Sequence, residues 1–230
     1  EEALNNGWIP AFAFAGQNAL ERPQTSDLLA RMKKAGARVL TASEKVLATV
    51  SRKDNPQTVI AAFKQRMTEL SDFPSDGMKR WIALYEVRDP GNLGTILRTA
   101  AATGLTDVYL SPDCASPWSP KALRAGMGAQ FGLHIYERSD LCELVQSSQI
   151  PTYATVLSGD SVSLYSLDLA IPTAWLVGNE GQGISPELAT VATARVHIPQ
   201  ADTPVESLNV AAATAVCLYE QFRQRTASVK

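Results

Sequence analysis

The sequence has few of the residues that build metal and redox sites. Its three cysteines, Cys114, Cys142 and Cys217, form no CxxC pair, and its only histidines are His134 and His197. An odd number of widely spaced cysteines is typical of free thiols in a reducing cytoplasm rather than of a disulfide framework. Because a metal site needs several clustered ligands of these types, we expect no bound metal ion.

Long apolar runs are also missing. The longest strongly apolar stretch, Val210 to Leu218, is well short of the roughly 20 residues that cross a bilayer. The segment Glu1 to Leu4 shows no basic region followed by an apolar one, so we expect no signal peptide. Hydrophobic residues make up 45% and charged residues 19% of 230 positions. We therefore expect a cytoplasmic globular protein of one large or two modest domains, without a membrane partner.

The chain carries little excess charge, and that charge is unevenly distributed. The net charge of −2 and the isoelectric point near 5.8 argue, taken alone, against a general nucleic-acid binder. Residues 1–80, however, carry a net charge of +3, and residues 81–230 carry −5. Grouped basic residues in the first third could contact phosphates, although a solvated helix surface explains any single one of them. The candidate phosphate contacts are Arg31, Lys33, Lys34, Arg52 and Lys53.

Residues 1–70 have the pattern of a small α/β domain. The apolar or β-branched runs at 9–15, 39–40 and 59–63 are candidate strands. Helical spacing at 25–35 and 44–50 predicts two helices, the second capped by Ser43. The following stretch is rich in Ser, Asp, Pro and Gly, which predicts a linker at 71–79.

From Trp81 onward, short apolar strands alternate with helices, and we place a second domain at 80–230. This alternation predicts a mostly parallel α/β sheet with helices on both faces, with ligands bound at the carboxyl ends of the strands. The expected strands are 81–86, 107–110, 133–136, 153–157, 174–177 and 195–198, and the expected helices are 92–103, 120–127, 139–147, 186–192 and 207–223.

A first chemical motif, DPGNLGTILRTA at 89–100, follows a strand and opens a helix. Asn92 lies at the start of that helix. Helical side chains lean toward the N-terminus, so we expect Arg98 to project over the bare Gly94 and leave room for a phosphate held by two hydrogen bonds. An ordinary strand–turn–helix with a surface arginine is the alternative interpretation.

A second motif, LVGNEGQGIS at 176–185, again joins a strand to a helix. Its glycines follow the pattern GxxGxG, so it is neither a dinucleotide-binding GxGxxG nor a Walker A loop, which needs a lysine. Three close glycines permit unusual φ values and a close approach of backbone to a ligand. Glu180 places a charge in this loop, where it could hold a substrate or an arginine, or simply face solvent.

A third motif combines IPQ at 198–200 with PVESLNVAAA at 204–213. Here a strand leads through a loop into the last helix. Ser207 is a natural N-cap for that helix. Asn209 would then lie in the first turn, where its side chain or the free N–H groups could face a ligand. A capped helix without a ligand is the simpler interpretation.

The order and spacing of the motifs are more specific than any one of them. The set NxGxxxR, GNEGxG and IP…SLNVAxA resembles the three signature motifs of the SpoU/TrmH family of RNA 2′-O-methyltransferases, over residues 81–225. The intervening segment 121–129 (KALRAGMGA) also looks like the corresponding family segment. SEKVL at 43–47 and NPQ at 55–57 are similar to the small RNA-binding domain that many members carry.

The resemblance implies a fold, a cofactor and a set of functional residues. Family members thread the C-terminal part of their α/β domain into a trefoil knot and form homodimers with the active site near the interface. S-adenosylmethionine is expected in the loops of the second and third motifs. The implied cofactor contacts are Gly178, Asn179, Gly183, Ile198, Ser207 and Leu208. The implied catalytic or structurally critical residues are Asn92, Arg98, Glu180, Ser207 and Asn209.

The resemblance also frames two questions about the chemistry. The family mechanism makes the arginine of the first motif a base, but a guanidinium stays protonated at neutral pH and is a poor base. We instead expect Arg98 to clamp an RNA phosphate and stabilise the developing alkoxide. The sequence departs from the family at Gln200 and Asp202, where Met and Gly are common, and the loop 198–208 is one residue longer.

The expected activity is transfer of a methyl group from S-adenosylmethionine to a ribose 2′-hydroxyl, in 23S ribosomal RNA. Transfer RNA is the alternative substrate, and an antibiotic-resistance methyltransferase would differ only in its target nucleotide. A catalytically idle RNA-binding module is a further alternative, against which the intact Asn92, Arg98, Glu180 and Asn209 argue. A nucleotide-binding oxidoreductase would need a GxGxxG with a later acidic residue, and the sequence has no such pair.

Overall fold

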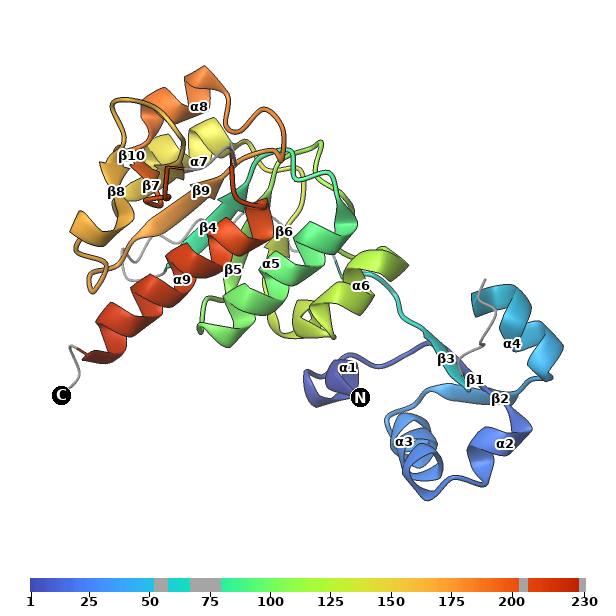
Figure 1. Cartoon of the computed structure of the whole chain (residues 1–230). Coiled ribbons are helices and arrows are strands. Elements are labelled where there is room, and N and C mark those ends of the chain that lie inside the picture. Colours follow the sequence, from blue (N-terminus) through green and yellow to red (C-terminus); the bar gives the residue numbers. More distant parts are fainter. Residues whose placement is uncertain (52–57, 67–79, 203–206, 228–230) are drawn as a thin grey trace. The chain divides into compact units, whose positions relative to one another are not determined.

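The computed structural model describes residues 1–51, 58–66, 80–202 and 207–227, which fall into two compact units, 1–66 and 67–230 (Figure 1). Each unit is described by itself. The expected linker at 71–79 and the turn at 55–57 lie outside the described residues. The domain limits 1–70 and 80–230 therefore stay a prediction.

The first unit is a three-stranded sheet with four short helices. Strand β1 (Phe12–Ala15) lies in the centre, parallel to β2 (Arg38–Thr41) and antiparallel to β3 (Val59–Ala62). The helices are α1 (Glu2–Asn5), α2 (Gln17–Leu20), α3 (Pro23–Lys34) and α4 (Glu44–Ser51).

Local sequence signals explain the two longer helices of this unit. Helix α3 begins with a proline in its first turn, and Leu29 and Met32 bury its apolar side against Ala13 and Ala15 of β1. Helix α4 follows Ser43, whose hydroxyl accepts a hydrogen bond from the backbone N–H of Val46 at 3.4 Å. The predicted cap at Ser43 is thus confirmed.

The second unit is a seven-stranded sheet in the order β6-β5-β4-β9-β7-β10-β8, with every pair of neighbours parallel. Its strands are β4 (Trp81–Leu84), β5 (Asp107–Leu110), β6 (His134–Tyr136), β7 (Thr152–Thr155), β8 (Val162–Ser163), β9 (Ala174–Val177) and β10 (Ala194–His197). Its helices are α5 (Pro90–Ala102), α6 (Pro120–Gly126), α7 (Leu141–Ser147), α8 (Pro186–Val191) and α9 (Val210–Ala227), with 3₁₀ turns η1 (Ala129–Gly132) and η2 (Leu164–Ser166).

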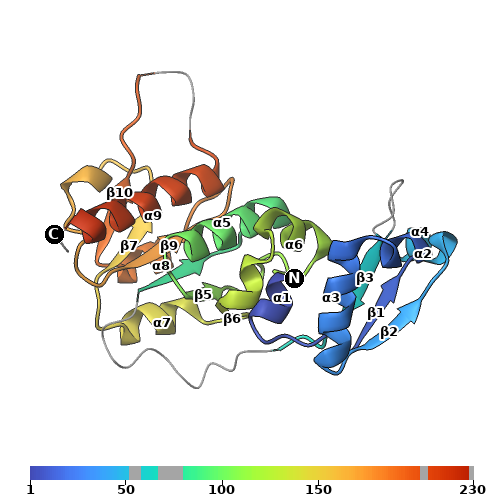
Figure 2. The ribbon, with the colours of Figure 1, turned by 90° about the horizontal axis from the view of Figure 1, so that it is seen from below.

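The sheet is buried on both faces, which confirms the predicted fold class. In β4, Ile82 and Leu84 point into a core shared with α5 and α9, whereas Trp81 and Ala83 point into a second core with α7 and α8. Figures 1 and 2 show these helix pairs on opposite sides of the strands. Two apolar faces explain why the strands are near-continuous apolar runs. The trefoil knot stays a prediction.

The described residues can be compared with the sequence for cysteine pairing, membrane-spanning helices and metal-binding groups. All three cysteines are free. Within the described ranges, no helix is both long and apolar enough to span a membrane. The same ranges hold no group of three or more Cys, His, Asp or Glu side chains placed to bind a metal ion.

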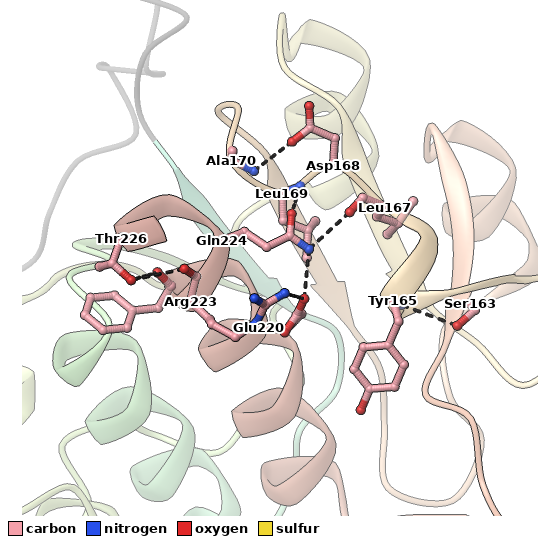
Figure 3. Close-up of polar contacts among 11 residues, drawn as sticks. Ser163, Tyr165, Leu167, Asp168, Leu169, Ala170, Glu220, Arg223, Gln224 and Thr226 are labelled. Atoms are coloured by element: carbon pink, nitrogen blue, oxygen red, sulfur yellow. Dashed lines mark hydrogen bonds and ion pairs between the residues drawn. The ribbon is translucent and has the colours of Figure 1, made fainter. Parts of the chain in front are cut away.

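The C-terminal part of α9 fastens the segment that leads into β9 (Figure 3). The Gln224 amide donates to the carbonyl of Leu167 at 3.2 Å and accepts from the N–H of Leu169 at 2.8 Å. It also donates to Glu220, which in turn binds the Arg223 guanidinium through both carboxylate oxygens. One helix turn therefore holds a loop that has little regular structure of its own.

This cluster predicts an acid-sensitive contribution to stability. The Arg223 hydrogen bonds outweigh burial and, with the Gln224 bond, lower the pKa of Glu220 to about 2. In the unfolded chain a glutamate has a pKa of about 4.3. The stabilisation by ionised Glu220 is therefore complete above that pH and is lost as pH falls toward 2. Because Arg223 is largely exposed, we expect this contribution to the free energy of unfolding to be on the order of 1 kcal/mol.

Urea unfolding of the Glu220→Gln variant from pH 2.5 to 7 measures this contribution. We expect the variant to be less stable than the parent at pH 7, and the difference to shrink as pH falls from about 4 toward 2.5. Glu143→Gln, which changes an exposed glutamate on α7, is the matched control. A Glu220→Gln deficit that does not vary with pH would contradict the prediction.

Candidate functional site

A cavity of about 360 Å³ lies where β7, β9 and β10 end. Its walls come from four separate segments, 155–157, 177–184, 196–200 and 207–213. The volume is in the range of small-molecule sites, and its place at the carboxyl ends of parallel strands is the expected one. All six implied cofactor contacts line it: Gly178, Asn179, Gly183, Ile198, Ser207 and Leu208.

The loop of the second motif folds back on itself beside this cavity. Asn179 and Gly183 form an antiparallel bridge, with N···O distances of 2.9 and 3.0 Å, and Gly183 has a φ of +71°. A Cβ atom on Gly178 would lie 2.3 Å from the carbonyl carbon of Gly183. The backbones meet so closely that only glycine fits there.

The side chain of Asn179 shapes this loop from within. Its oxygen accepts from the N–H groups of Gly181 and Gln182 at 2.9 and 3.0 Å, and its amide donates to the carbonyl of Glu86 at 2.8 Å. Glu86 has a φ of +53°, an uncommon conformation for a non-glycine residue, and its N–H donates to the hydroxyl of Ser111. This positive φ had no signal in the sequence.

Glu180 joins the second motif to the first. Its carboxylate accepts three hydrogen bonds: from the N–H of Arg88 at 3.3 Å, the N–H of Asp89 at 3.2 Å and the amide of Asn92 at 3.1 Å. The Asn92 oxygen in turn accepts from the Asn209 amide at 3.1 Å. The structure thus brings together one predicted residue from each of the three motifs.

The ionisation of Glu180 follows from these contacts. Burial opposes the charged form, but the hydrogen bonds from Asn92 and from the backbone N–H groups outweigh it and lower the pKa of the carboxyl. Glu180 is therefore a carboxylate at neutral pH with its acceptor positions in use. It is suited to holding the second-motif loop to the start of α5 rather than to transferring protons.

The last helix begins later than the sequence predicts. Asn209 accepts hydrogen bonds from the N–H groups of Ala211 at 2.9 Å and Ala212 at 3.2 Å, so it is the N-cap and α9 starts at Val210. The prediction that Ser207 caps the helix was wrong. One asparagine both caps the helix and donates to Asn92, whereas Ser207 is left exposed on the cavity wall.

Asp89 and Lys121 belong to the same neighbourhood, although neither is among the predicted site residues. Asp89 caps α5 by accepting from the N–H of Asn92 at 2.9 Å, and its second oxygen lies 2.6 Å from the Lys121 ammonium. The hydrogen bond from Lys121 and that from Asn92 lower the pKa of Asp89. The signal for Asp89 was available, because an aspartate before Pro90 at a helix start is a typical cap.

Arg98 is exposed on α5 and does not line the cavity. It makes no hydrogen bond or ion pair with any part of the chain that the structure describes. The expectation that Gly94 leaves room for an anion was wrong. Gly94 is buried against α6, where an added Cβ would lie 2.4 Å from the carbonyl oxygen of Ala122 and 2.7 Å from the Ala125 side chain.

The candidate RNA contacts of the first unit differ in their surroundings. Arg31 binds Glu1 at 3.4 Å and Asn5 at 2.8 Å, so it holds α1 to α3. Lys33 and Lys34 are exposed at the end of α3. Arg52 and Lys53 lie outside the described residues.

The cavity wall also includes residues that sequence reasoning did not select. The end of β7, Thr155 to Leu157, lines it and had no motif to mark it. His197 lines it as well, with its Nδ1 atom 2.9 Å from the Ser161 hydroxyl. Gln200, at which the sequence departs from the family, is a third such residue.

The comparisons with known proteins agree on one family. The family model described as the SpoU rRNA Methylase family matches residues 79–219, and the one described as RNA 2′-O ribose methyltransferase substrate binding matches residues 1–68. An uncharacterised tRNA/rRNA methyltransferase of Synechocystis is 39% identical over 189 residues, which cover 81% of this chain and 68% of that protein.

Two further relatives extend the comparison to a named activity and a solved structure. The 23S rRNA (guanosine(2553)-2′-O)-methyltransferase RlmP of Bacillus subtilis is 30% identical over 77% of this chain and 69% of its own length. The AdoMet-bound rRNA methyltransferase of Sinorhizobium meliloti has a TM-score of 0.84 and 37% identity, over 96% of this chain and 83% of that one. The chain belongs to the SpoU rRNA methylase family.

Proposed function

We propose that this protein transfers a methyl group from S-adenosylmethionine to a ribose 2′-hydroxyl of RNA. The observation that carries the proposal is the network of Glu180, Asn92 and Asn209, which joins all three motifs beside a cavity lined by the six implied cofactor contacts. Relatives named as RNA 2′-O-methyltransferases, and a solved AdoMet-bound relative 37% identical to this chain, support it.

The cavity suits the cofactor in shape and in chemistry. Leu157, Ile198 and Leu208 provide apolar walls, and the Gly178–Gly183 loop lines another side of the cavity. Bound S-adenosylmethionine would supply an electrophilic methyl group on a sulfonium. The absence of a side chain at Gly178 is what lets the loop close to this shape.

The residues of this chain then have separable roles. Glu180 holds Asn92 and the start of α5 in a fixed position, and Asn209 links them to α9, so the substrate ribose meets a preorganised surface. Arg98 binds a phosphate of the RNA and stabilises the negative charge that develops on the 2′-oxygen. A guanidinium cannot readily accept the proton, so the 2′-hydroxyl proton leaves to solvent water as the oxygen–methyl bond forms and the sulfur–methyl bond breaks.

Ribosomal RNA is the proposed substrate class, with 23S RNA first. Several similar proteins carry names with a 23S target, such as the guanosine methyltransferase of Bacillus subtilis and a uridine methyltransferase of Streptomyces viridochromogenes. Residues 1–68 match the substrate-binding model, which supports RNA contacts by Lys33 and Lys34. Because the relatives differ in their target base, none of their nucleotides is assigned to this chain.

The same proposal includes a trefoil knot, a homodimer and a cytoplasmic location. The knot rests on the family to which residues 79–219 belong. The homodimer is supported by the side of α9 that exposes Tyr219 and Phe222, two large apolar side chains. Light scattering on the purified protein tests the dimer directly.

The activity is tested by supplying methyl-labelled S-adenosylmethionine together with RNA from a strain that lacks the gene. Ribosomal and transfer RNA are separated after the reaction and digested to nucleosides. We expect label in a 2′-O-methyl nucleoside of the ribosomal fraction. Label only in transfer RNA would make transfer RNA, rather than ribosomal RNA, the substrate. Cofactor binding without methyl transfer to RNA or to a ribosomal precursor would contradict the proposed methyltransferase activity.

Replacing Glu180 by glutamine should lower methyl transfer roughly 10- to 100-fold, because charge-assisted hydrogen bonds of this kind are worth about 1.5–3 kcal/mol each. The glutamine amide would face the N–H groups of Arg88 and Asp89 and repel at least one of them. Initial rates on ribosomal RNA measure the loss. The control is Glu187→Gln, an exposed glutamate on α8, and equal rates in the two variants would contradict the prediction.

A further inference from the structure

Helices α5 and α6 carry basic residues and no acidic ones. The segments 90–106 and 114–136, which contain both helices, hold no aspartate or glutamate, although residues 81–230 as a whole have a net charge of −5. Arg98 on α5 and Lys121 and Arg124 on α6 are all exposed. The positive charge is thus local, on an otherwise acidic unit.

The packing of the two helices brings Lys121 to the face of α5 that carries Arg98. Figures 1 and 2 both show α5 and α6 side by side, and Gly94 lies against the backbone of α6. A Cβ on Gly91 would lie 3.3 Å from the Cε atom of Lys121. Gly91 and Arg98 are seven residues apart, which puts them on the same face of α5. Lys121 therefore lies over the start of the face that carries Arg98.

The basic face begins at the proposed catalytic network. Lys121 binds the Asp89 carboxylate at 2.6 Å, and Asp89 caps α5 through the N–H of Asn92. Arg124 follows Lys121 by three residues, so the two are neighbours on the surface of α6. In the described parts of the chain Arg124 has no hydrogen-bond or ion-pair partner. One end of the face thus contacts the network, and the other is free to bind an anion.

We infer that Lys121 and Arg124 bind phosphates of the RNA strand adjacent to the nucleotide whose ribose is methylated. The inference rests on the proposed function and extends it to a phosphate-binding surface on α6. An arginine matches a phosphate with two parallel hydrogen bonds, and the Lys121 ammonium keeps two donors after binding Asp89. No carboxylate on either helix opposes a polyanion. Arg98 would bind the phosphate nearest the reacting ribose.

The salt dependence of RNA binding tests this surface. Each phosphate contact that is lost should reduce the slope of log Kd against log salt concentration by about 0.7 to 1. In filter binding to in vitro transcribed 23S ribosomal RNA, we expect Arg124→Gln to reduce the slope by that amount. Affinity near 100 mM KCl should fall roughly 3- to 10-fold. Lys121→Gln is the second variant and should behave alike.

The matched control is Arg138→Gln, which removes one exposed arginine after β6, outside both helices. We expect it to leave the slope unchanged. Equal slope changes in Arg124→Gln and Arg138→Gln, or none in either α6 variant, would overturn the inference. Calorimetric binding of S-adenosylmethionine checks that each variant is folded. RNA binding with the expected slopes but without methyl transfer would support this surface while contradicting the proposed activity.

Discussion

A Gly178→Ala variant should bind S-adenosylmethionine at least about 100-fold more weakly than the parent. The added Cβ would lie 2.3 Å from the Gly183 carbonyl carbon and 2.5 Å from both the Gly183 oxygen and the Ile184 nitrogen. All three are backbone atoms, so no side chain can move aside to relieve the overlap. The bridge between Asn179 and Gly183 must open, and the cavity wall opens with it.

Isothermal titration calorimetry with S-adenosylmethionine measures the loss, and thermal unfolding checks that the variant is folded. The same loop offers a matched control, Gly181→Ala. A Cβ at Gly181 would meet only the Asn179 oxygen, at 3.6 Å, which is an ordinary contact. We expect that variant to bind within a few-fold of the parent. Similar affinities for Gly178→Ala and Gly181→Ala would show that the close backbone approach does not control the cofactor site.

Replacing Arg98 by alanine should reduce methyl transfer roughly 100- to 1000-fold, the effect usual for removing one donor that stabilises a developing oxyanion. Because Arg98 does not line the cavity, S-adenosylmethionine should bind the variant as it binds the parent. The large expected effect reflects a role confined to the RNA and the reacting oxygen. The Arg98 and Gly178 variants therefore test different steps, because Gly178→Ala should weaken cofactor binding itself.

Single-turnover rates with ribosomal RNA, measured beside cofactor affinity, test this prediction. Arg98→Lys keeps the charge but loses the planar pair of donors, so its rate should lie between those of the parent and Arg98→Ala. Arg138→Ala removes another exposed arginine and should react at the parental rate. Full activity of Arg98→Lys would argue against both a phosphate clamp and an arginine base.

Much of the second unit followed from the sequence because its strands are buried on both faces. A strand such as Ala174–Val177 must then be apolar throughout, and the run that marks it has the bounds found in the structure. The four-residue helices α1 and α2 and the two-residue strand β8 were not predicted. Segments this short contain no full period of an apolar pattern, so tertiary packing decides them.

In the candidate site, too, some features were predicted from the sequence and others were decided only by the fold. The resemblance of the three motifs to the SpoU/TrmH family was enough to select Asn92, Glu180 and Asn209. The motifs did not determine which residue caps α9, because Ser207 and Asn209 are both good caps. In the folded chain Asn209 caps the helix and also donates to Asn92. The contact between Lys121 and Asp89 joins residues 32 positions apart, and nothing local signals it.

By itself, the sequence determined the family, the parallel α/β fold and the three motifs, and it predicted cofactor contacts that line one cavity. The tertiary structure alone decided that Glu180 is an ionised anchor for the start of α5, that Gly94 serves helix packing, and that Lys121 reaches Asp89. The physical reason is the distance along the chain over which each kind of interaction acts. Strand and helix periodicity, turns and caps act over a few residues, whereas close backbone approach and the hydrogen-bond partners of a carboxylate depend on segments brought together by folding.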